Sequence, residues 1–226
     1  MSTDNLTPKS HLIRNLSIIL LTTIALTYGV SRATRPEPAI DISAATVKGK
    51  QTAVFAGGCF WGMEAVFEHL KGVTDVVSGF SGGNAATANY EIVSSGLTGH
   101  AESVKVTYDP SKISYNQLLK IYFLVAHDPT QLNHQGPDSG TQYRSAIFFA
   151  NDEQKRVAQA YIDQLNKAHV FQKQIVTQLV PLKGFYQAEA YHQHFIDHNP
   201  NYPYVVVNDL PKLAHLQAQF PDMYKK

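Results

Sequence analysis

One short stretch of the sequence combines a thiol with aromatic and flexible residues. Residues 53–64 read AVFAGGCFWGME and contain Cys59 and Trp61, the only cysteine and the only tryptophan of the chain. The apolar run before the two glycines predicts a buried strand, and the apolar spacing after Cys59 predicts a helix. Because glycine tolerates sharp turns, we expect Cys59 to lie at a strand-to-helix junction.

This junction would suit a nucleophile. The positive end of a helix dipole stabilises a thiolate, which is the nucleophilic form of cysteine. The alternative is a buried Cys59 that acts as a small hydrophobic residue, as most lone cysteines do. The next two residues, Phe60 and Trp61, offer flat apolar faces that suit a small, methyl-bearing group. Simple burial would explain Phe60 equally well.

Glu102 is the leading candidate for an acid. It lies at the start of a predicted strand, directly after a long loop at residues 81–100. A carboxyl group near aromatic surface has its pKa raised by desolvation and can donate a proton near neutral pH. An exposed carboxylate at a strand edge is the alternative.

Two long loops hold further candidate residues. Tyr90 lies in the loop 81–100, and Asp138 and Tyr143 lie in a second polar loop at residues 127–145. Loops of this length inside a compact domain are usually functional or disordered. Phenols can donate hydrogen bonds to a developing oxyanion. Asp138 is either a second acid or a turn residue.

Three histidines, His192, His194 and His198, raise the question of a metal. His194 and His198 are one helical turn apart, but Asp197, the nearest acidic residue, would lie on another face of that helix. We therefore expect no metal site. A cysteine protease would need a histidine partner and an oxyanion hole, and the ten histidines of the chain leave that alternative open.

Strands and helices alternate along the part of the chain that would position these residues. Capping patterns mark helix starts at Ser114, Asn151 and Asp209. Strands are predicted at residues 53–56, 73–80, 102–108, 146–150 and 175–182, and helices after Cys59, at 114–125, after Asn151, and at 188–198 and 211–220. This order predicts an α+β domain with helices layered on a sheet.

The composition is that of a folded globular protein. The chain has 226 residues, of which 44% are apolar and 16% are charged, and its formal net charge is +1. This length suits one substantial domain. The low net charge disfavours a nucleic-acid-binding surface, and a single cysteine excludes an internal disulfide and a cysteine-rich zinc site.

The N-terminal segment is distinct from the rest of the chain. Residues 16–30 read LSIILLTTIALTYGV and contain no charged residue. Such a stretch suits the hydrophobic region of a signal peptide or a membrane anchor and is short for a full bilayer span. We predict a signal peptide or anchor at 1–33, a linker at 34–49 and a folded domain at 50–226. The domain would then be extracytoplasmic, either periplasmic or secreted, or membrane-anchored.

The sequence around the cysteine, GCFWGME at 58–64, resembles the signature of the A-type peptide methionine sulfoxide reductases. Six further motifs of that family follow in the family's order. They are GFSGG at 79–83, YE and SG between 90 and 96, TGHAE at 98–102, YDP at 108–110, HDP at 127–129 and GTQYRS at 140–145. The resemblance covers roughly residues 52–208, and an ordered set is far more specific than one glycine pattern.

The resemblance implies a single catalytic domain, a two-layer α/β sandwich with a ferredoxin-like core. It implies that Cys59 reduces free or peptide-bound methionine S-sulfoxide and becomes a sulfenic acid, in a reaction that repairs oxidised proteins. The family uses no metal or organic cofactor. Its electrons come from an external thiol reductant such as thioredoxin, glutaredoxin or a periplasmic equivalent.

The resemblance also implies roles for individual residues. The methyl group of the substrate would be held by Phe60 and Trp61. Glu102 would bind and protonate its oxygen together with two phenols, Tyr90 and Tyr143. Asp138 would help to arrange the pocket.

The chain departs from many family members because it has no second cysteine to resolve the sulfenic acid. A resolving thiol must come from outside, through a mixed disulfide or direct attack. We expect the partners to be oxidised proteins and a thiol reductant, with export or membrane contact through the N-terminus and a monomeric state. Two alternatives are a one-cysteine thiol peroxidase and a module that binds oxidised methionine without turnover.

Overall fold

The computed structural model describes residues 36–42 and 49–225, which lie in a compact unit of residues 33–226. The predicted signal peptide or anchor at residues 1–33 lies outside the described residues. Within the described ranges, no helix has the length and apolar character needed to cross a membrane.

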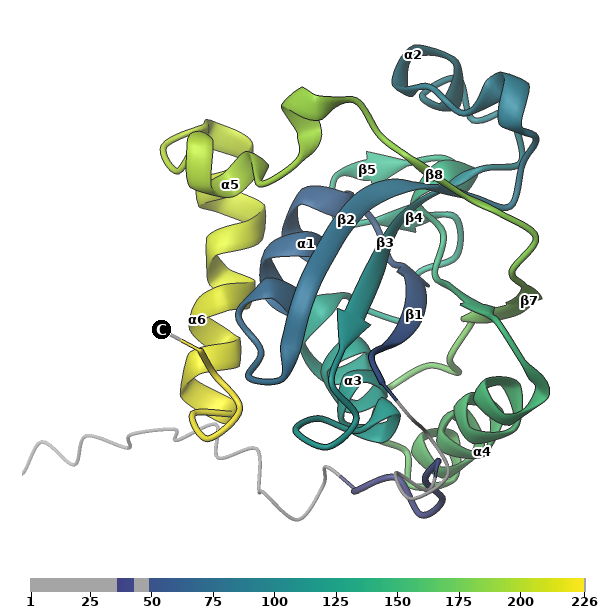
Figure 1. The fold of residues 1–226 in the computed structure, drawn as a ribbon, viewed down its shortest axis with the longest axis vertical. Coiled ribbons are helices and arrows are strands. Elements are labelled where there is room, and N and C mark those ends of the chain that lie inside the picture. The colour runs from purple at the N-terminus through teal and green to yellow at the C-terminus, as the bar shows by residue number, and fades with distance from the viewer. Residues whose placement is uncertain (1–35, 43–48, 226) are drawn as a thin grey trace, which may run out of the picture. The chain divides into compact units, whose positions relative to one another are not determined.

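A six-stranded sheet forms the centre of this unit (Figure 1). Its strand order is β7-β6-β1-β3-β2-β8, and every neighbouring pair is antiparallel except β6 and β7. The strands are β1 (Gln51–Ala56), β2 (Val73–Ser81), β3 (Ala101–Tyr108), β6 (Ala146–Phe149), β7 (Gln178–Pro181) and β8 (Phe185–Gln187). The strand predicted at 175–182 is β7, which begins three residues later than expected. The other four predicted strands are confirmed within a few residues.

Four strands and two helices form the predicted ferredoxin-like core. The chain runs β1-α1-β2-β3-α3-β6, with α1 (Phe60–Glu68) and α3 (Tyr115–Ile121), and the sheet order of these strands is β6-β1-β3-β2. Phe55 of β1, Phe67 of α1 and Leu118 of α3 are fully buried in one apolar cluster. Because burial of apolar surface drives folding, this cluster fixes α1 on the sheet. The predicted fold class is confirmed.

The sheet is strongly curled at one end. Strands β7 and β8 lie at opposite edges, but only residues 182–184 connect them. Four Cα-to-Cα steps reach at most about 15 Å, whereas five strand spacings in a flat sheet span about 24 Å. The sheet must therefore bend to bring its edges together. Leu182 and Phe185 pack there against a second apolar cluster that includes Phe148.

Helices begin after all three predicted N-terminal residues, but only two of the three side-chain caps are confirmed. The Ser114 hydroxyl accepts the Gln117 N–H, and the Gln117 side chain accepts the Ser114 N–H, which forms a capping box. The Asn151 side chain accepts a backbone N–H in the first turn of α4 (Asp152–Lys167). A π-helical segment, Tyr122–Ala126, continues the chain after α3.

The C-terminal region differs from the prediction. Two short helices replace the single helix predicted at 188–198, namely η6 (Ala190–His192) and α5 (Phe195–His198). His194 separates them because its φ of +51° is left-handed and cannot continue a right-handed helix. Asp209 does not cap α6 (Leu210–Gln219) with its side chain, which instead forms an ion pair with Lys212 at 3.1 Å. Both predictions are wrong.

The two long loops contain short regular elements. The first holds η3 (Ala85–Thr87) and α2 (Tyr90–Val93), and the second holds β4 (His134–Gln135), β5 (Asp138–Ser139) and η5 (Thr141–Tyr143). The β4-β5 hairpin and η5 place the second loop next to the start of α1, where the candidate thiol lies.

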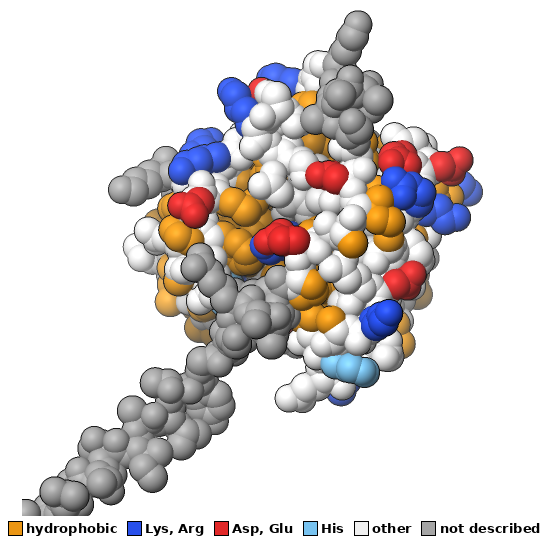
Figure 2. Space-filling view, turned by 90° about the horizontal axis from the view of Figure 1, so that it is seen from below, with side chains coloured by type: hydrophobic (Ala, Val, Ile, Leu, Met, Phe, Trp, Pro, Cys, Tyr) orange, Lys and Arg blue, Asp and Glu red, His pale blue; other side chains and the backbone are white. Residues whose placement is uncertain are grey.

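Part of the predicted linker lies against the domain. The Tyr161 hydroxyl donates to the Pro36 carbonyl at 3.1 Å, and the Gln164 amide donates to the Glu37 carbonyl at 2.7 Å. The domain boundary near residue 50 stays a prediction. On the face shown in Figure 2, acidic and basic side chains are interspersed, which agrees with the low net charge.

Candidate active site

Cys59 occupies the junction between β1 and α1, as predicted. Gly58 has a φ of +91°, a conformation that favours glycine, and a Cβ there would lie 2.5 Å from the Gln135 side chain. A Cβ on Gly57 would lie 2.7 Å from the His127 ring. The two glycines therefore let the second long loop pack directly against the turn that holds the thiol.

The expectation that the helix N-terminus favours a Cys59 thiolate is wrong for the substrate-free protein. The residue is 8% exposed, and burial raises its pKa well above the ordinary value, with further increases from the carboxylates of Glu102 and Asp209. The backbone N–H of Trp61 and the Lys212 ammonium group lower this pKa, but the effect of burial is larger. The resting side chain is a thiol.

Glu102 is buried beside the thiol instead of exposed at a strand edge. It is 2% exposed, and one of its carboxyl oxygens accepts the Phe60 N–H at 3.0 Å. Burial raises the pKa of Glu102 to about 8; the Phe60 hydrogen bond lowers it in part, and the Asp138 carboxylate raises it slightly. Near neutral pH, Glu102 therefore holds a proton that it can donate.

The two predicted phenols face the same group of charges. Burial raises the pKa of Tyr90 and of Tyr143, and the charges of Glu102 and Cys59 raise both further. Asp138 also raises the pKa of Tyr143. Both hydroxyls keep their protons near neutral pH and are available as hydrogen-bond donors.

Phe60 is a core residue that reaches the site through its backbone. Its side chain is fully buried, and its ring centroid lies 5.8 Å from that of Phe80 and 6.5 Å from that of Tyr90. Its N–H is the group that holds Glu102. The predicted contact of the Phe60 ring with a methyl group stays a prediction.

Trp61 is half-buried among aromatic rings from the C-terminal region. It stacks on Phe195 with 3.6 Å between ring centroids, and Tyr204 stands edge-on to it at 6.0 Å. The Tyr204 hydroxyl donates a hydrogen bond to the Asp138 carboxylate. These contacts connect three residues into one wall of the site next to the thiol, namely Trp61, Tyr204 and Asp138.

His192 orients this wall and is not joined by the other two histidines. Its Nδ1 accepts the Trp61 Nε1–H at 3.0 Å, so a neutral ring has its proton on Nε2. Burial lowers the pKa of His192, which favours this neutral form. The rings of His194 and His198 lie 6.5 Å apart, and His194 forms an ion pair with Glu68 near the end of α1.

Sequence reasoning missed the contribution of the C-terminal segment. Asp209 is fully buried, and a Cβ on Gly62 would lie 2.1 Å from its Oδ1 and 2.8 Å from the Lys212 ammonium. Gly62 thus lets this ion pair approach the first turn of α1. The one available signal was Gly62, which follows Trp61 in the predicted helix. Nothing in the sequence spacing connects this glycine to Asp209 and Lys212.

The structure thus brings all seven predicted site residues together on β1-α1, β3 and the two loops.

A family model described as peptide methionine sulfoxide reductase matches residues 51–224. "Peptide methionine sulfoxide reductase MsrA 2" of Mesorhizobium japonicum is 61% identical over 79% of this chain and 91% of its own length. Its namesake from Synechocystis is 55% identical over 84% of this chain and 90% of its own length.

Solved structures agree with these relatives. The reduced form of Mxr1 from Saccharomyces cerevisiae aligns with a TM-score of 0.62 and 34% identity, over 68% of this chain and 87% of that one. Methionine sulfoxide reductase A of Corynebacterium diphtheriae aligns with a TM-score of 0.60 and 33% identity, over 73% of this chain and 82% of that one. The chain therefore belongs to the peptide methionine sulfoxide reductase family and is an oxidoreductase that reduces methionine sulfoxide.

Proposed function

We propose that this enzyme reduces the S epimer of methionine sulfoxide through a sulfenic acid on Cys59. The observation that supports this most directly is the buried Glu102 carboxyl, whose pKa burial raises to about 8, beside the only thiol of the chain. A sulfoxide needs a nucleophile for its sulfur and a proton for its oxygen, and these two side chains supply both. The apolar surface of Trp61, backed by Phe60, would contact the methyl group.

The protons and electrons of this step balance. The Cys59 sulfur attacks the substrate sulfur while Glu102 gives its proton to the sulfoxide oxygen, and Glu102 then takes up the thiol proton. The attack forms a bond between the two sulfurs. The protonated oxygen then moves from the substrate sulfur to the Cys59 sulfur, so the sulfur–oxygen bond of the substrate and the new sulfur–sulfur bond both break and Cys59 becomes S–OH. The substrate sulfur leaves with an electron pair as the thioether of methionine. Cys59 is oxidised and methionine sulfoxide is reduced.

Two phenols would stabilise the oxygen during this step, and Asp138 would order the site around it. Tyr90 and Tyr143 keep their protons and lie close enough to Glu102 to feel its charge, so their hydroxyls can donate to the developing negative oxygen. Asp138 would order the same side of the site through its hydrogen bond from Tyr204.

An external thiol would regenerate the enzyme. Because Cys59 is the only cysteine, no disulfide can form within the chain. A thiolate that attacks the S–OH group releases water and forms a mixed disulfide, and a second thiol then restores Cys59. Thioredoxin, glutaredoxin or a periplasmic equivalent are the reductants that we propose. Since Cys59 is 8% exposed, the attacking thiol must be small or must protrude from its protein.

We also propose that the domain works outside the cytoplasm. The support is the uncharged apolar stretch at residues 16–30. A fusion of residues 1–49 to alkaline phosphatase, which is active only after export, should be active in bacterial cells. An inactive fusion that is produced in full would contradict export.

A single turnover without reductant tests the reaction. The full chain is mixed with one equivalent of a peptide S-sulfoxide, and methionine formation is followed together with trapping of the sulfenic acid by a dimedone reagent. We expect one methionine per chain and a trapped Cys59, with no reaction of the R-sulfoxide. The Cys59→Ser variant is the matched control. Binding without methionine formation in the unmodified chain would show a binding module instead of an enzyme.

A further inference from the structure

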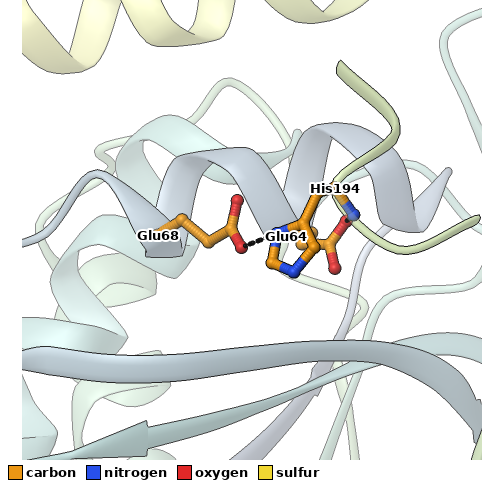
Figure 3. Close-up of side chains that lie close together, drawn as sticks. All are labelled: Glu64, Glu68 and His194. Carbon is orange, nitrogen blue, oxygen red and sulfur yellow. Dashed lines mark hydrogen bonds and ion pairs between the residues drawn. The ribbon is translucent and has the colours of Figure 1, made fainter. Parts of the chain in front are cut away.

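Two carboxylates and an imidazole meet on the side of α1 that faces α5 (Figure 3). Glu64 and Glu68 are one turn apart on α1 and share a face of the helix. His194 comes from the chain just before α5 and lies over both. One potential ligand atom from each residue lies within 4.8 Å of the other two.

Glu64 is the residue that points to a missing ligand. It is 1% exposed, and its Oε2 accepts the His194 N–H at 2.9 Å. Among the residues that the structure describes, none gives its Oε1 a hydrogen bond. The buried Ser78 hydroxyl lies near this carboxyl and lowers its pKa, and it too has no hydrogen-bond partner among the described residues. A buried carboxylate oxygen without a partner is costly, so natural proteins seldom leave one unsatisfied.

The charges of the cluster also favour a cation. Glu64 is buried, and Glu68 is one turn away on the same face of α1, so two carboxylates lie close together. His194 Nδ1 lies 2.7 Å from Glu68 Oε1, which is its single ion-pair contact among the described residues. One imidazole can neutralise one carboxylate at most, so the second stays uncompensated when ionised.

We propose that Glu64, Glu68 and His194 bind one divalent transition-metal ion, with Zn²⁺ as the best match. Since no separation exceeds 4.8 Å, one point lies within about 2.8 Å of all three atoms, and Zn²⁺ needs about 2.0–2.2 Å to nitrogen and oxygen ligands. Small rotations of the Glu68 and His194 side chains, which are 20% and 52% exposed, would close this difference.

An entry path leads to the cluster. A surface pocket of about 300 Å³ is lined by Glu68, His194 and Asp197 among others. Water from this pocket can fill the fourth position of a tetrahedral ion. The backbone hydrogen bond from His194 to Glu64 already holds two of the three ligands in place, so less ordering is required when the ion binds.

The bound ion would join α1 to the segment that supports the active site. The same segment carries His192, which accepts the Trp61 indole hydrogen bond, and Phe195, which stacks on Trp61. The site lies apart from Cys59 and Glu102, so its proposed role is to stabilise this wall and not to take part in the reaction.

Zinc titration of the full chain carrying Cys59→Ser tests the site, because this change removes the thiol that would otherwise bind zinc. We expect calorimetry at pH 7 to give one Zn²⁺ per chain and a rise in the unfolding temperature with zinc but not with Mg²⁺, which avoids imidazole. Adding Glu64→Gln or His194→Gln should each weaken zinc binding by roughly tenfold or more.

Two further variants control for surface histidines. His134→Gln and His198→Gln, at exposed positions outside the three-residue cluster, should leave zinc affinity unchanged. Binding that persists in both Glu64→Gln and His194→Gln would overturn the assignment. The same holds if the parent chain takes up no zinc, or if zinc leaves its unfolding temperature unchanged, since the cluster would then be a plain ion pair.

Discussion

Replacement of Glu102 by glutamine should make the enzyme slower and the fold less sensitive to pH. Glutamine has nearly the shape of glutamate, and its amide oxygen can still accept the Phe60 N–H that holds Glu102 at 3.0 Å. The change removes the acidic proton and leaves the hydrogen bond. Any loss of rate therefore reports the proton, and any change in how stability varies with pH reports the shifted pKa of the carboxyl group.

The effect on stability follows from the pKa. Glu102 has its pKa raised from 4.5 to about 8, so the folded chain binds more protons than the unfolded chain between these values. For an acid shifted upward, stability is unaffected below pH 4.5 and falls as pH rises toward 8. At pH 7 this penalty is about 3 kcal/mol at most. Glu102→Gln removes it, while the cost of burying the amide does not depend on pH.

The effect on rate has the opposite sign. Loss of a general acid slows a reaction by about 10²–10⁴-fold. In the unmodified enzyme, about nine-tenths of Glu102 is protonated at pH 7 and about one-tenth at pH 9, so the rate of methionine formation should fall about tenfold over this range. Glu102→Gln should lose this dependence.

Two assays on the same preparations check both effects. Single-turnover methionine formation is measured from pH 6 to 9, and urea unfolding is measured near pH 4 and pH 7. Asp163→Asn, at an exposed site on α4 that forms no ion pair among the described residues, is the control and should change neither. The reasoning is refuted if Glu102→Gln keeps the rate, or if the two proteins show the same change in unfolding free energy between the two pH values.

Three further predictions concern neighbouring residues. Gly62→Ala should destabilise the fold by about 1–3 kcal/mol, because the new Cβ would lie 2.1 Å from the buried Asp209 carboxylate. Urea unfolding measures this loss, and an unchanged unfolding midpoint would contradict the prediction. Asp209→Asn should lower the Cys59 pKa and speed alkylation by iodoacetamide at pH 8, whereas an equal or slower rate would argue against this charge effect. The His127 ring should stay neutral at pH 5, since burial lowers its pKa to about 4; an NMR titration near 6.5 would disprove this.

The core and the catalytic residues could be predicted because their signals are local. The alternation of Val104 and Val106 in β3 and the capping box at Ser114 each depend on residues close in sequence. The glycines before Cys59 likewise predicted the strand-to-helix turn. These features were found because neighbours along the chain decide them.

The failures arose where distant residues decide the outcome. His194 takes a left-handed conformation while its N–H binds Glu64, which lies 130 residues earlier. Asp209 packs against Gly62 and pairs with Lys212 instead of capping α6. The thiolate prediction for Cys59 failed for the same reason, since a local helix effect was outweighed by burial that no short segment reveals.

The burial of Cys59 and Glu102 also favours a sulfoxide reductase over a thiol peroxidase. A peroxidase needs a thiolate at rest, but burial keeps Cys59 protonated, and it also keeps the proton on Glu102. A resting enzyme with both protons in place suits a substrate whose oxygen must be protonated as its sulfur is attacked. At equal concentration, an S-sulfoxide peptide should therefore oxidise Cys59 roughly tenfold faster or more than hydrogen peroxide. Stopped-flow trapping of the sulfenic acid measures both rates, and faster oxidation by peroxide would favour the peroxidase.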